Sequence, residues 1–391
     1  MANPSRPYQR IPYLILHRDP AGPGAVRDVY GGTGEFVALE SHLLRPENNP
    51  SNSVIVMMHP IGGGAYLPMT TALAKAGLHV IYCNSRYRGN DSALIMEKCV
   101  LDLGACIGDL KTRFGYEKVI LGGWSGGGSL SLFYQDQAEN PTITHTPAGD
   151  EVDLVSAKLI PADGVLLLAA HISRSITMTE WLDPSILDED APFDREPSLN
   201  IYDRRCPERP PYSAEFVGRF REAQVARNRR ITGRAKKQLA ELKASGHPDA
   251  ERCFVVQGTM CDVRWTDPSQ DASDRRPYTC YLGDPVLAND GPVGLGRFTT
   301  LRSWLSQWSY DESRANGVRN AARVSCPVLV INNSADLACT PSHAQRLFEA
   351  IASKDKGFVE IKGADHYYLE RPDLLPEAVR AVTTWMADRE F

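Results

Sequence analysis

The chain has 391 residues and a formal net charge of -5 at pH 7, so its electrostatics give no case for a nucleic-acid partner. No apolar run reaches the roughly 18 residues of a membrane-spanning helix, and the first residues lack the apolar core of a signal peptide. Nine cysteines without a close-paired pattern favour reduced thiols and a cytoplasmic location, and no His/Cys cluster has zinc-like spacing, so we expect no metal.

The N-terminal part of the chain alternates apolar runs with helix-compatible segments. This alternation is typical of an α/β protein with a doubly wound, mostly parallel sheet. In chain order we expect strands at 13–17, 36–44, 54–58 and 78–83, and helices at 69–76 and 100–113.

A glycine-rich loop, His59-Pro60-Ile61-Gly62-Gly63-Gly64, follows the strand at 54–58. Backbone N–H groups of such a loop can stabilise the oxyanion of an acyl-transfer reaction. Because Pro60 has no N–H, the donor from this loop should be Ile61 or Gly62. An alternative interpretation makes His59 a catalytic base, but its position directly after an early strand suits a role in bracing the loop.

A serine between glycines follows the next apolar run, Lys118–Leu121. The sequence Gly122-Gly123-Trp124-Ser125-Gly126-Gly127-Gly128 joins this strand to a helix-compatible segment at 129–138. A strand, a serine between glycines and a helix form the turn that exposes a nucleophilic hydroxyl, because the glycines let strand and helix pass closely. A glycine-rich turn with an incidental serine is the alternative.

A long segment between about His171 and Ala321 follows the strand predicted at 164–170. Its residues 214–244 predict a helix, and residues 215–243 carry nine Lys or Arg against three Glu. That charge allows an anion or membrane-surface site, but Gly233 and a thin apolar stripe favour a solvated helix face instead.

Aromatic residues concentrate in the last part of the same segment, between Arg264 and Trp308. Apolar residues there recur at i, i+3, i+4 and i+7, which predicts one helix with an apolar face. Such a face is either packed core or the roof of an acyl or aromatic pocket. The four residues are Leu301, Trp304, Leu305 and Trp308.

Two chemically important residues follow the last predicted strands. Asp336 comes just after an apolar run at 327–333, and His366 follows the run at 358–361 and a glycine turn. Polar side chains at the carboxyl ends of parallel strands gather at one edge of the sheet. Asp336 could instead cap the helix predicted near 342–351. Asp365 is a rival acid beside His366, and an amphipathic helix at 374–386 closes the chain.

With Ser125, Asp336 and His366 in this order at strand ends, the chain resembles an α/β-hydrolase-fold serine hydrolase, esterase- or lipase-like. The resemblance covers nearly everything except the long segment, and it implies a hydrolase core at 1–170 and 321–391 with a largely helical inserted cap at 171–320. The loop at 84–91 is similar to the Arg-Gly loop of that family. Pro60 departs from the more usual His-Gly pair and leaves open which amide completes the oxyanion hole.

The resemblance implies chemistry at named positions. Ser125 would attack a carbonyl, His366 would act as general base, and Asp336 would orient the imidazole. The oxyanion hole would use Gly126 together with Ile61 or Gly62. Residues considered for a substrate pocket are Trp124, Trp304 and Trp308.

Cleavage of a carboxylic ester, lactone or thioester is the expected activity, on a small apolar or aromatic acyl substrate and without a cofactor. An acyltransferase and a carbon–carbon bond hydrolase of the same fold are the alternatives. A binding protein that retains only the fold is disfavoured, because both Ser125 and His366 are present. A homo-oligomer is possible.

Overall fold

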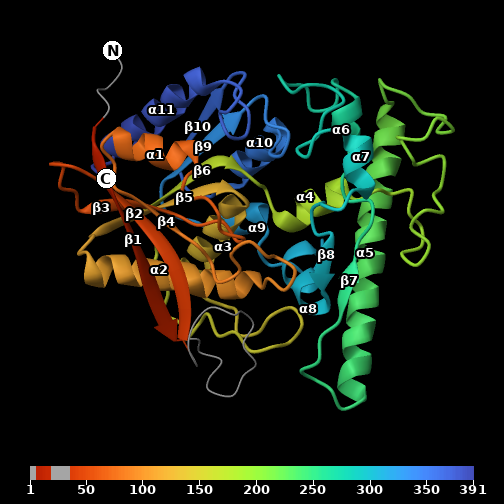
Figure 1. Ribbon diagram of the computed structural model, residues 1–391, viewed down its shortest axis with the longest axis horizontal. Coiled ribbons are helices and arrows are strands. Elements are labelled where there is room, and N and C mark those ends of the chain that lie inside the picture. Colours follow the sequence, from red (N-terminus) through yellow and green to blue (C-terminus); the bar gives the residue numbers. More distant parts are fainter. Residues whose placement is uncertain (1–5, 19–35) are drawn as a thin grey trace. The chain divides into compact units, whose positions relative to one another are not determined.

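The computed structural model describes residues 6–18 and 36–391 (Figure 1). Its contacts divide the chain into two compact units. The core unit comprises the residues up to Asn90, Met96–Ser173 and Ala315–Phe391, and the inserted unit comprises Asp91–Ile95 and Arg174–Arg314. The role of the second unit as a cap remains a prediction.

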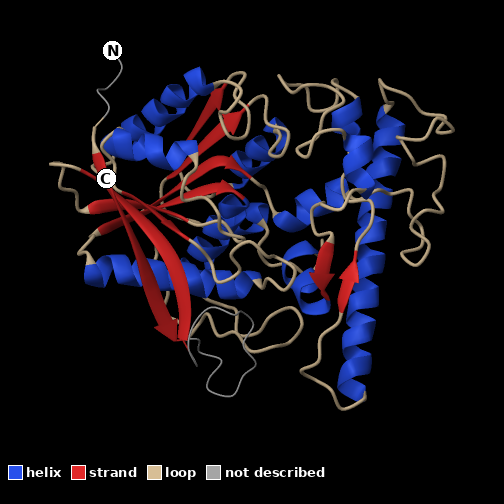
Figure 2. Ribbon diagram, viewed as in Figure 1, coloured by secondary structure: helices blue, strands red, loops and turns tan. Residues whose placement is uncertain are grey.

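An eight-stranded sheet forms the centre of the core unit within the described residues, in the order β1-β2-β4-β3-β5-β6-β9-β10 (Figure 2). β2 runs antiparallel to β1 and β4, and the other neighbouring pairs are parallel. The predicted α/β class with a mostly parallel sheet is therefore confirmed. The strands are β1 Tyr8–Arg18, β2 Phe36–Pro46, β3 Ser53–Met57, β4 Val80–Cys83, β5 Lys118–Ser125, β6 Gly164–Ala170, β9 Val328–Asn333 and β10 Lys356–Ile361.

Helices cover both faces of this sheet, as the continuous apolar strands require. On one face, the side chains of Ile55 and Met57 pack with Leu73 of α1 and Trp385 of α11 in one buried cluster. α2 and α3 lie on the opposite face (Figure 1). The core-unit helices are α1 Pro68–Lys75, α2 Met96–Arg113, α3 Gly126–Glu139, α9 Gly317–Ala321, α10 Pro341–Ala350, the 3-10 helix η2 Pro372–Leu374 and α11 Leu375–Ala387.

A long helix and a short β-ribbon organise the inserted unit. α5 spans Ala214–Ala244, as predicted, and β7 pairs antiparallel with β8 in a ribbon that the sequence pattern did not predict. The remaining elements are α4 Arg174–Trp181, β7 Cys253–Val255, α6 Val263–Thr266, α7 Pro285–Asp290, β8 Phe298–Thr300, α8 Leu301–Ser303 and the π-helix η1 Trp304–Trp308.

Several basic residues of α5 are paired with acids from other parts of the inserted unit. Arg227 is fully buried, and its guanidinium also donates to the carbonyls of Asp183, Gln257 and Gly258. Pairing of this kind supports a structural role for the positive charge rather than an anion site. The pairs are Arg221–Asp262, Arg227–Glu189, Arg229–Asp311, Arg234–Asp190 and Lys236–Glu312.

The aromatic face predicted at 301–308 is wound partly as a π-helix rather than as one α-helix. The Ser309 N–H donates to the Trp304 carbonyl at 2.8 Å, which is the i to i+5 bond of a π turn. Trp304 and Trp308 are both fully buried. The Trp304 Nε1–H donates to Thr232 Oγ1 of α5, and the Arg174 guanidinium lies over the Trp308 ring. These contacts favour the packed-core interpretation of the face.

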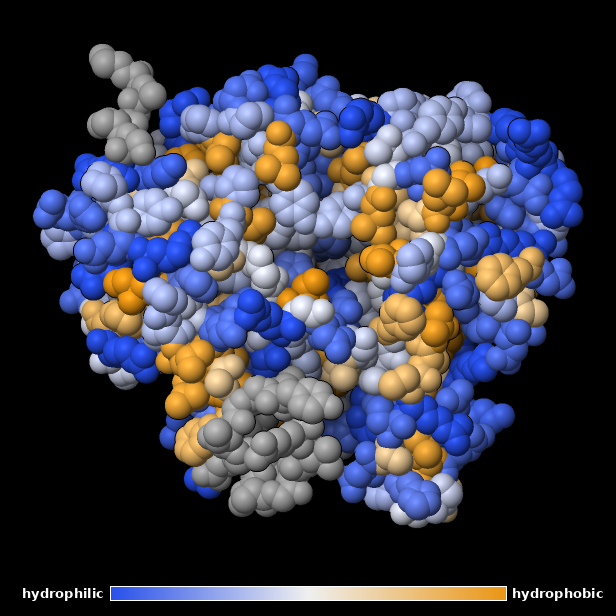
Figure 3. Space-filling view, viewed as in Figure 1, coloured by the Kyte–Doolittle hydropathy of each residue, from blue (hydrophilic) through white to orange (hydrophobic). Residues whose placement is uncertain are grey.

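Hydrophilic residues predominate on the face drawn in Figure 3, with apolar residues in small groups between them. In the inserted unit, Leu287 and Phe298 are among the exposed apolar side chains. Scattered exposure of this kind is ordinary for a folded protein. Across the described ranges, no helix has both the length and the apolar character needed to cross a bilayer.

Candidate active site

A strained turn presents Ser125 at the junction of β5 and α3. Ser125 has φ 53° and ψ -128°, a conformation that residues with a side chain rarely adopt. The neighbouring glycines make this turn possible, since a Cβ on Gly123 would lie 2.7 Å from the Cα of Gly128. The sequence pattern therefore folds into the sharp strand-to-helix turn that it predicts.

Asp336 and His366 meet at the carboxyl ends of β9 and β10. His366 Nδ1 lies 2.6 Å from Asp336 Oδ2. The second carboxylate oxygen, Oδ1, accepts the N–H groups of Ala338 at 2.7 Å and Cys339 at 2.9 Å. Asp336 has no exposed surface, so these three bonds fix its orientation. The structure thus places Asp336 against the imidazole and not at the N-cap position of α10, which Thr340 occupies.

Asp365, the rival acid, points its carboxylate back into its own loop. It accepts the backbone N–H groups of the four residues Tyr367, Leu369, Glu370 and Arg371, at 2.9, 3.2, 2.9 and 3.4 Å. Burial raises the pKa of Asp365, but these amides outweigh burial and hold the pKa below its ordinary value. The carboxylate therefore anchors the loop that carries His366.

Ser125 belongs to the same cluster of side chains. Its hydroxyl lies near enough to the Cys339 thiol to lower the pKa of that group, and ligand atoms of Asp336, Cys339 and His366 all lie within 4.8 Å of one another. Trp124 packs beside His366, with ring centroids 4.8 Å apart, and its Nε1–H donates to the His366 carbonyl at 3.4 Å. The structure therefore brings the three predicted residues together.

Cys339 is the member of this cluster that the sequence reasoning missed. It follows Asp336 by three residues and stands just before Pro341, where α10 begins. Burial and the charge of Asp336 raise the pKa of the Cys339 thiol well above its ordinary value, although the nearby Ser125 hydroxyl opposes the shift. The Asp-x-x-Cys spacing ahead of a helix-starting proline was the available signal.

The loop His59–Gly64 lies against the serine turn, but the amides of Ile61 and Gly62 are engaged within the loop. The Gly62 N–H donates to the His59 carbonyl at 2.9 Å, and the Ile61 N–H donates to His59 Nδ1 at 3.3 Å. A Cβ on Gly126 would lie 2.7 Å from His59 Nε2, so the imidazole flanks the first predicted oxyanion donor. The bond from Ile61 agrees with a bracing role for His59.

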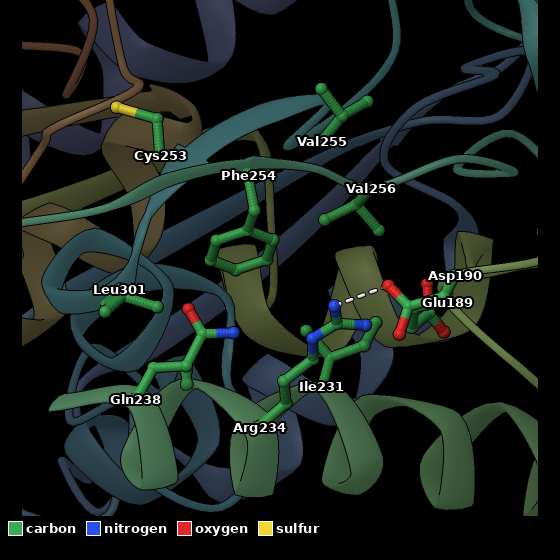
Figure 4. Close-up of a pocket in the computed structure, with 11 residues that line it drawn as sticks. Glu189, Asp190, Ile231, Arg234, Gln238, Cys253, Phe254, Val255, Val256 and Leu301 are labelled. Atoms are coloured by element: carbon green, nitrogen blue, oxygen red, sulfur yellow. Dashed lines mark hydrogen bonds and ion pairs between the residues drawn. The ribbon is translucent and has the colours of Figure 1, made fainter. Parts of the chain in front are cut away.

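The three tryptophans predicted for the substrate pocket are divided between the two units. Trp124 belongs to the core unit beside His366, whereas Trp304 and Trp308 are buried within the inserted unit. The inserted unit also contains a cavity of about 340 Å³ between α5 and the β7–β8 ribbon (Figure 4). Apolar side chains that include Ile231 and Val256 line it together with the ion pair between Arg234 and Asp190. No residue predicted for the site lines this cavity.

Comparisons with known proteins identify the fold. No protein-family model matches the chain, and no curated protein matches its sequence. Among solved structures, the α/β hydrolase GrgF from Penicillium sp. sh18 superposes with a TM-score of 0.50 and 11% identity, over 98% of this chain and 100% of that chain. A hypothetical protein from Pseudomonas aeruginosa gives a TM-score of 0.49 and 12% identity, over 97% of this chain and 93% of that one.

Est1E from Butyrivibrio proteoclasticus is also similar, with a TM-score of 0.47 and 13% identity over 90% of this chain and 95% of that one. Identities this low show only the fold. Together with the sheet order, the likeness to GrgF shows that the chain has the α/β-hydrolase fold.

Proposed function

We propose that the protein is a serine hydrolase that cleaves a carboxylic ester through an acyl-enzyme on Ser125. The contact between His366 Nδ1 and Asp336 Oδ2, 2.6 Å long and buried beside the strained Ser125, carries this proposal. An imidazole held by a buried carboxylate and close to a serine at a strand-to-helix turn is the arrangement that nucleophilic catalysis requires.

The proposed steps follow from the protonation of the imidazole. A carboxylate can only accept a hydrogen bond, so Nδ1 of His366 carries the proton and Nε2 keeps its lone pair. Nε2 takes the Ser125 proton as the oxygen attacks the substrate carbonyl, and then gives it to the leaving alcohol. Water attacks the acyl-enzyme by the same route and releases the acid. No cofactor takes part in these steps.

Charge on the tetrahedral intermediate needs two N–H donors. The Gly126 amide is the proposed first donor, because it opens α3, where the helix dipole also favours negative charge. For the second donor we favour Ile61 over Gly62. The Ile61 bond to His59 Nδ1 is 3.3 Å long, so exchanging it for an oxyanion costs less than breaking the 2.9 Å Gly62 bond.

Replacing Gly62 by alanine should damage this loop and lower kcat by about tenfold or more. Gly62 has φ +70°, and a Cβ there would lie 2.6 Å from Asn84 Oδ1, the atom that accepts the Gly63 N–H. Gly63→Ala is the matched control. Its φ of +85° imposes similar backbone strain, about 1–2 kcal/mol, but its Cβ would meet open space. Steady-state kinetics of the two variants test the loop, and equal losses of kcat would contradict this account.

A fluorophosphonate probe tests the chemistry without knowledge of the natural substrate. We expect covalent labelling of Ser125, located by peptide mass spectrometry, and hydrolysis within a panel of nitrophenyl esters of increasing acyl length. A competing alcohol in the same assay distinguishes hydrolysis from acyl transfer. Labelling of another serine, or no labelling of the folded protein, would overturn the proposal.

The inserted unit is the proposed cap that selects the substrate. Its buried tryptophans can either pack in the core of the unit or contact the substrate, and substitutions distinguish the two roles. Trp304→Ala should destabilise the protein by roughly 3–5 kcal/mol, because the indole is fully buried and its N–H is bonded to Thr232. Trp304→Phe should cost less, since it keeps most of the ring volume. A changed ranking of acyl lengths with an unchanged thermal midpoint would instead assign Trp304 to the pocket.

A further inference from the structure

A buried Asp-Cys-His cluster lies inside the site just described. Asp336, Cys339 and His366 are 0%, 4% and 5% exposed, and each offers one ligand atom within 4.8 Å of the other two. Carboxylate, thiolate and imidazole are the ligand types of zinc sites in proteins. Three ligand types of this kind at one point are a reason to consider metal binding as well as catalysis.

The fold, and not the local sequence, assembles these ligands. The Cys339 N–H bond to Asp336 Oδ1 turns the loop after β9 back on itself, so that the thiol lies beside the carboxylate. His366 comes from the loop after β10, 30 residues further along the chain than Asp336. No zinc-like spacing appears in the sequence for this reason, and the expectation of no metal site rested on that spacing.

The dimensions suit a cation of the size of Zn²⁺ after a small adjustment. With Zn–S near 2.3 Å and Zn–N near 2.0–2.1 Å, tetrahedral ligand atoms lie roughly 3.4–3.6 Å apart. The three ligand atoms now lie within 4.8 Å of one another, and side-chain shifts of about 1 Å would bring them to that tetrahedral separation. The Ser125 hydroxyl, which lies near Cys339, or a water molecule can supply the fourth ligand.

We propose that Asp336, Cys339 and His366 form an inhibitory site for one thiophilic divalent cation, Zn²⁺ being the biological example. On binding, the Cys339 S–H bond breaks, its proton goes to solvent, and a metal–sulfur bond forms without oxidation or reduction. Coordination by Nε2 of His366 would occupy the lone pair of the base. Coordination by Nδ1 would break the bond to Asp336 and move the Nδ1 proton to Nε2, so that Nε2 has no free lone pair. Either mode stops His366 from accepting the Ser125 proton.

Cobalt tests this site directly, because Co²⁺ occupies zinc sites and a cysteine ligand gives a sulfur-to-metal absorption band in the near ultraviolet. We expect CoCl₂ to produce this band in the wild-type protein and ZnCl₂ to abolish it. Cys339→Ser should lose the band and weaken zinc binding by about 100-fold or more, since even partners that only support a metal ligand contribute 10–100-fold. Cys253→Ser is the matched control, because Cys253 is an exposed thiol in the inserted unit.

Inhibition is measured separately, as the rate of fluorophosphonate labelling with and without ZnCl₂. Zinc should slow labelling of the wild type and of Cys253→Ser but not of Cys339→Ser. A cobalt band that survives Cys339→Ser, or disappears in Cys253→Ser, would overturn the proposal, as would its absence from the wild type. Should Cys339→Ser lose its native circular dichroism, Cys339→Ala repeats the test.

The cobalt readout rests on geometry alone, whereas the inhibition arm rests on the proposed function. If the protein resists the probe in the absence of metal but shows the cobalt band, the metal-site proposal stands and the serine-hydrolase proposal is overturned. If the probe labels the protein in the absence of metal but no cobalt band appears, the serine-hydrolase proposal stands and the metal-site proposal is overturned.

Discussion

Ser125→Ala should lower kcat by on the order of 10⁴ to 10⁶ while the protein stays folded, by analogy with triad deletions in other serine hydrolases. The substitution removes the oxygen that forms the acyl-enzyme and leaves the neighbouring Cys339 side chain in place. Alanine retains the Cβ, so the strained backbone at φ 53° is no harder to form than with serine. Turnover of the best nitrophenyl ester, measured with circular dichroism of the same sample, checks the result.

Ser129→Ala is the matched control for this substitution. Ser129 is buried one turn into α3, and its hydroxyl bonds to the Gly126 carbonyl. It therefore shares the helix and the loss of a hydroxyl with Ser125→Ala, but not the position of the nucleophile. We expect its kcat to stay within about threefold of wild type. If Ser125→Ala retained more than a tenth of the wild-type activity, the nucleophile would have to be another residue.

The fold was predictable from the sequence because buried parallel strands are continuous apolar runs. The run at 164–170 coincides with β6, and the runs after Pro327 and before Lys362 coincide with most of β9 and β10. The serine turn was predictable for a steric reason, since the close approach of Gly123 and Gly128 excludes side chains. In both cases the local structure restricts which residue types can stand at those positions, so the sequence shows it directly.

Features set by tertiary contacts were not predictable in the same way. The amide of Gly63 depends on Asn84, and the contact of Cys339 with Ser125 joins two loops more than two hundred residues apart. The β7–β8 ribbon pairs two strands of three residues each, too short for a period-2 pattern to register. The π-helix at 304–308 has the apolar spacing of an α-helix, so the spacing of apolar residues cannot distinguish its wider turn from an α-helical one.

The choice between the two acids also required the structure, and it gives the second large expected effect. Asp336→Asn should lower kcat by about 10⁴, as the corresponding change does in other triads. The asparagine oxygen can still accept the Ala338 and Cys339 amides that bond to Oδ1. Its NH₂ group then faces His366 Nδ1 and donates to it. The imidazole proton moves to Nε2, which can no longer take the proton of Ser125.

Asp365→Asn should behave in the opposite sense, with kcat lowered less than about tenfold and stability reduced. The carboxylate of Asp365 accepts four backbone N–H groups and does not face the imidazole nitrogen that bonds to Asp336. Because folding lowers the pKa of Asp365, its ionised form stabilises the native state above the pKa of the unfolded chain. That stabilisation is lost as pH falls through the lower, folded-state pKa. The stability gap between wild type and Asp365→Asn should therefore narrow in acid, as urea titrations at several pH values can measure. A larger loss of kcat in Asp365→Asn than in Asp336→Asn would transfer the orienting role to Asp365.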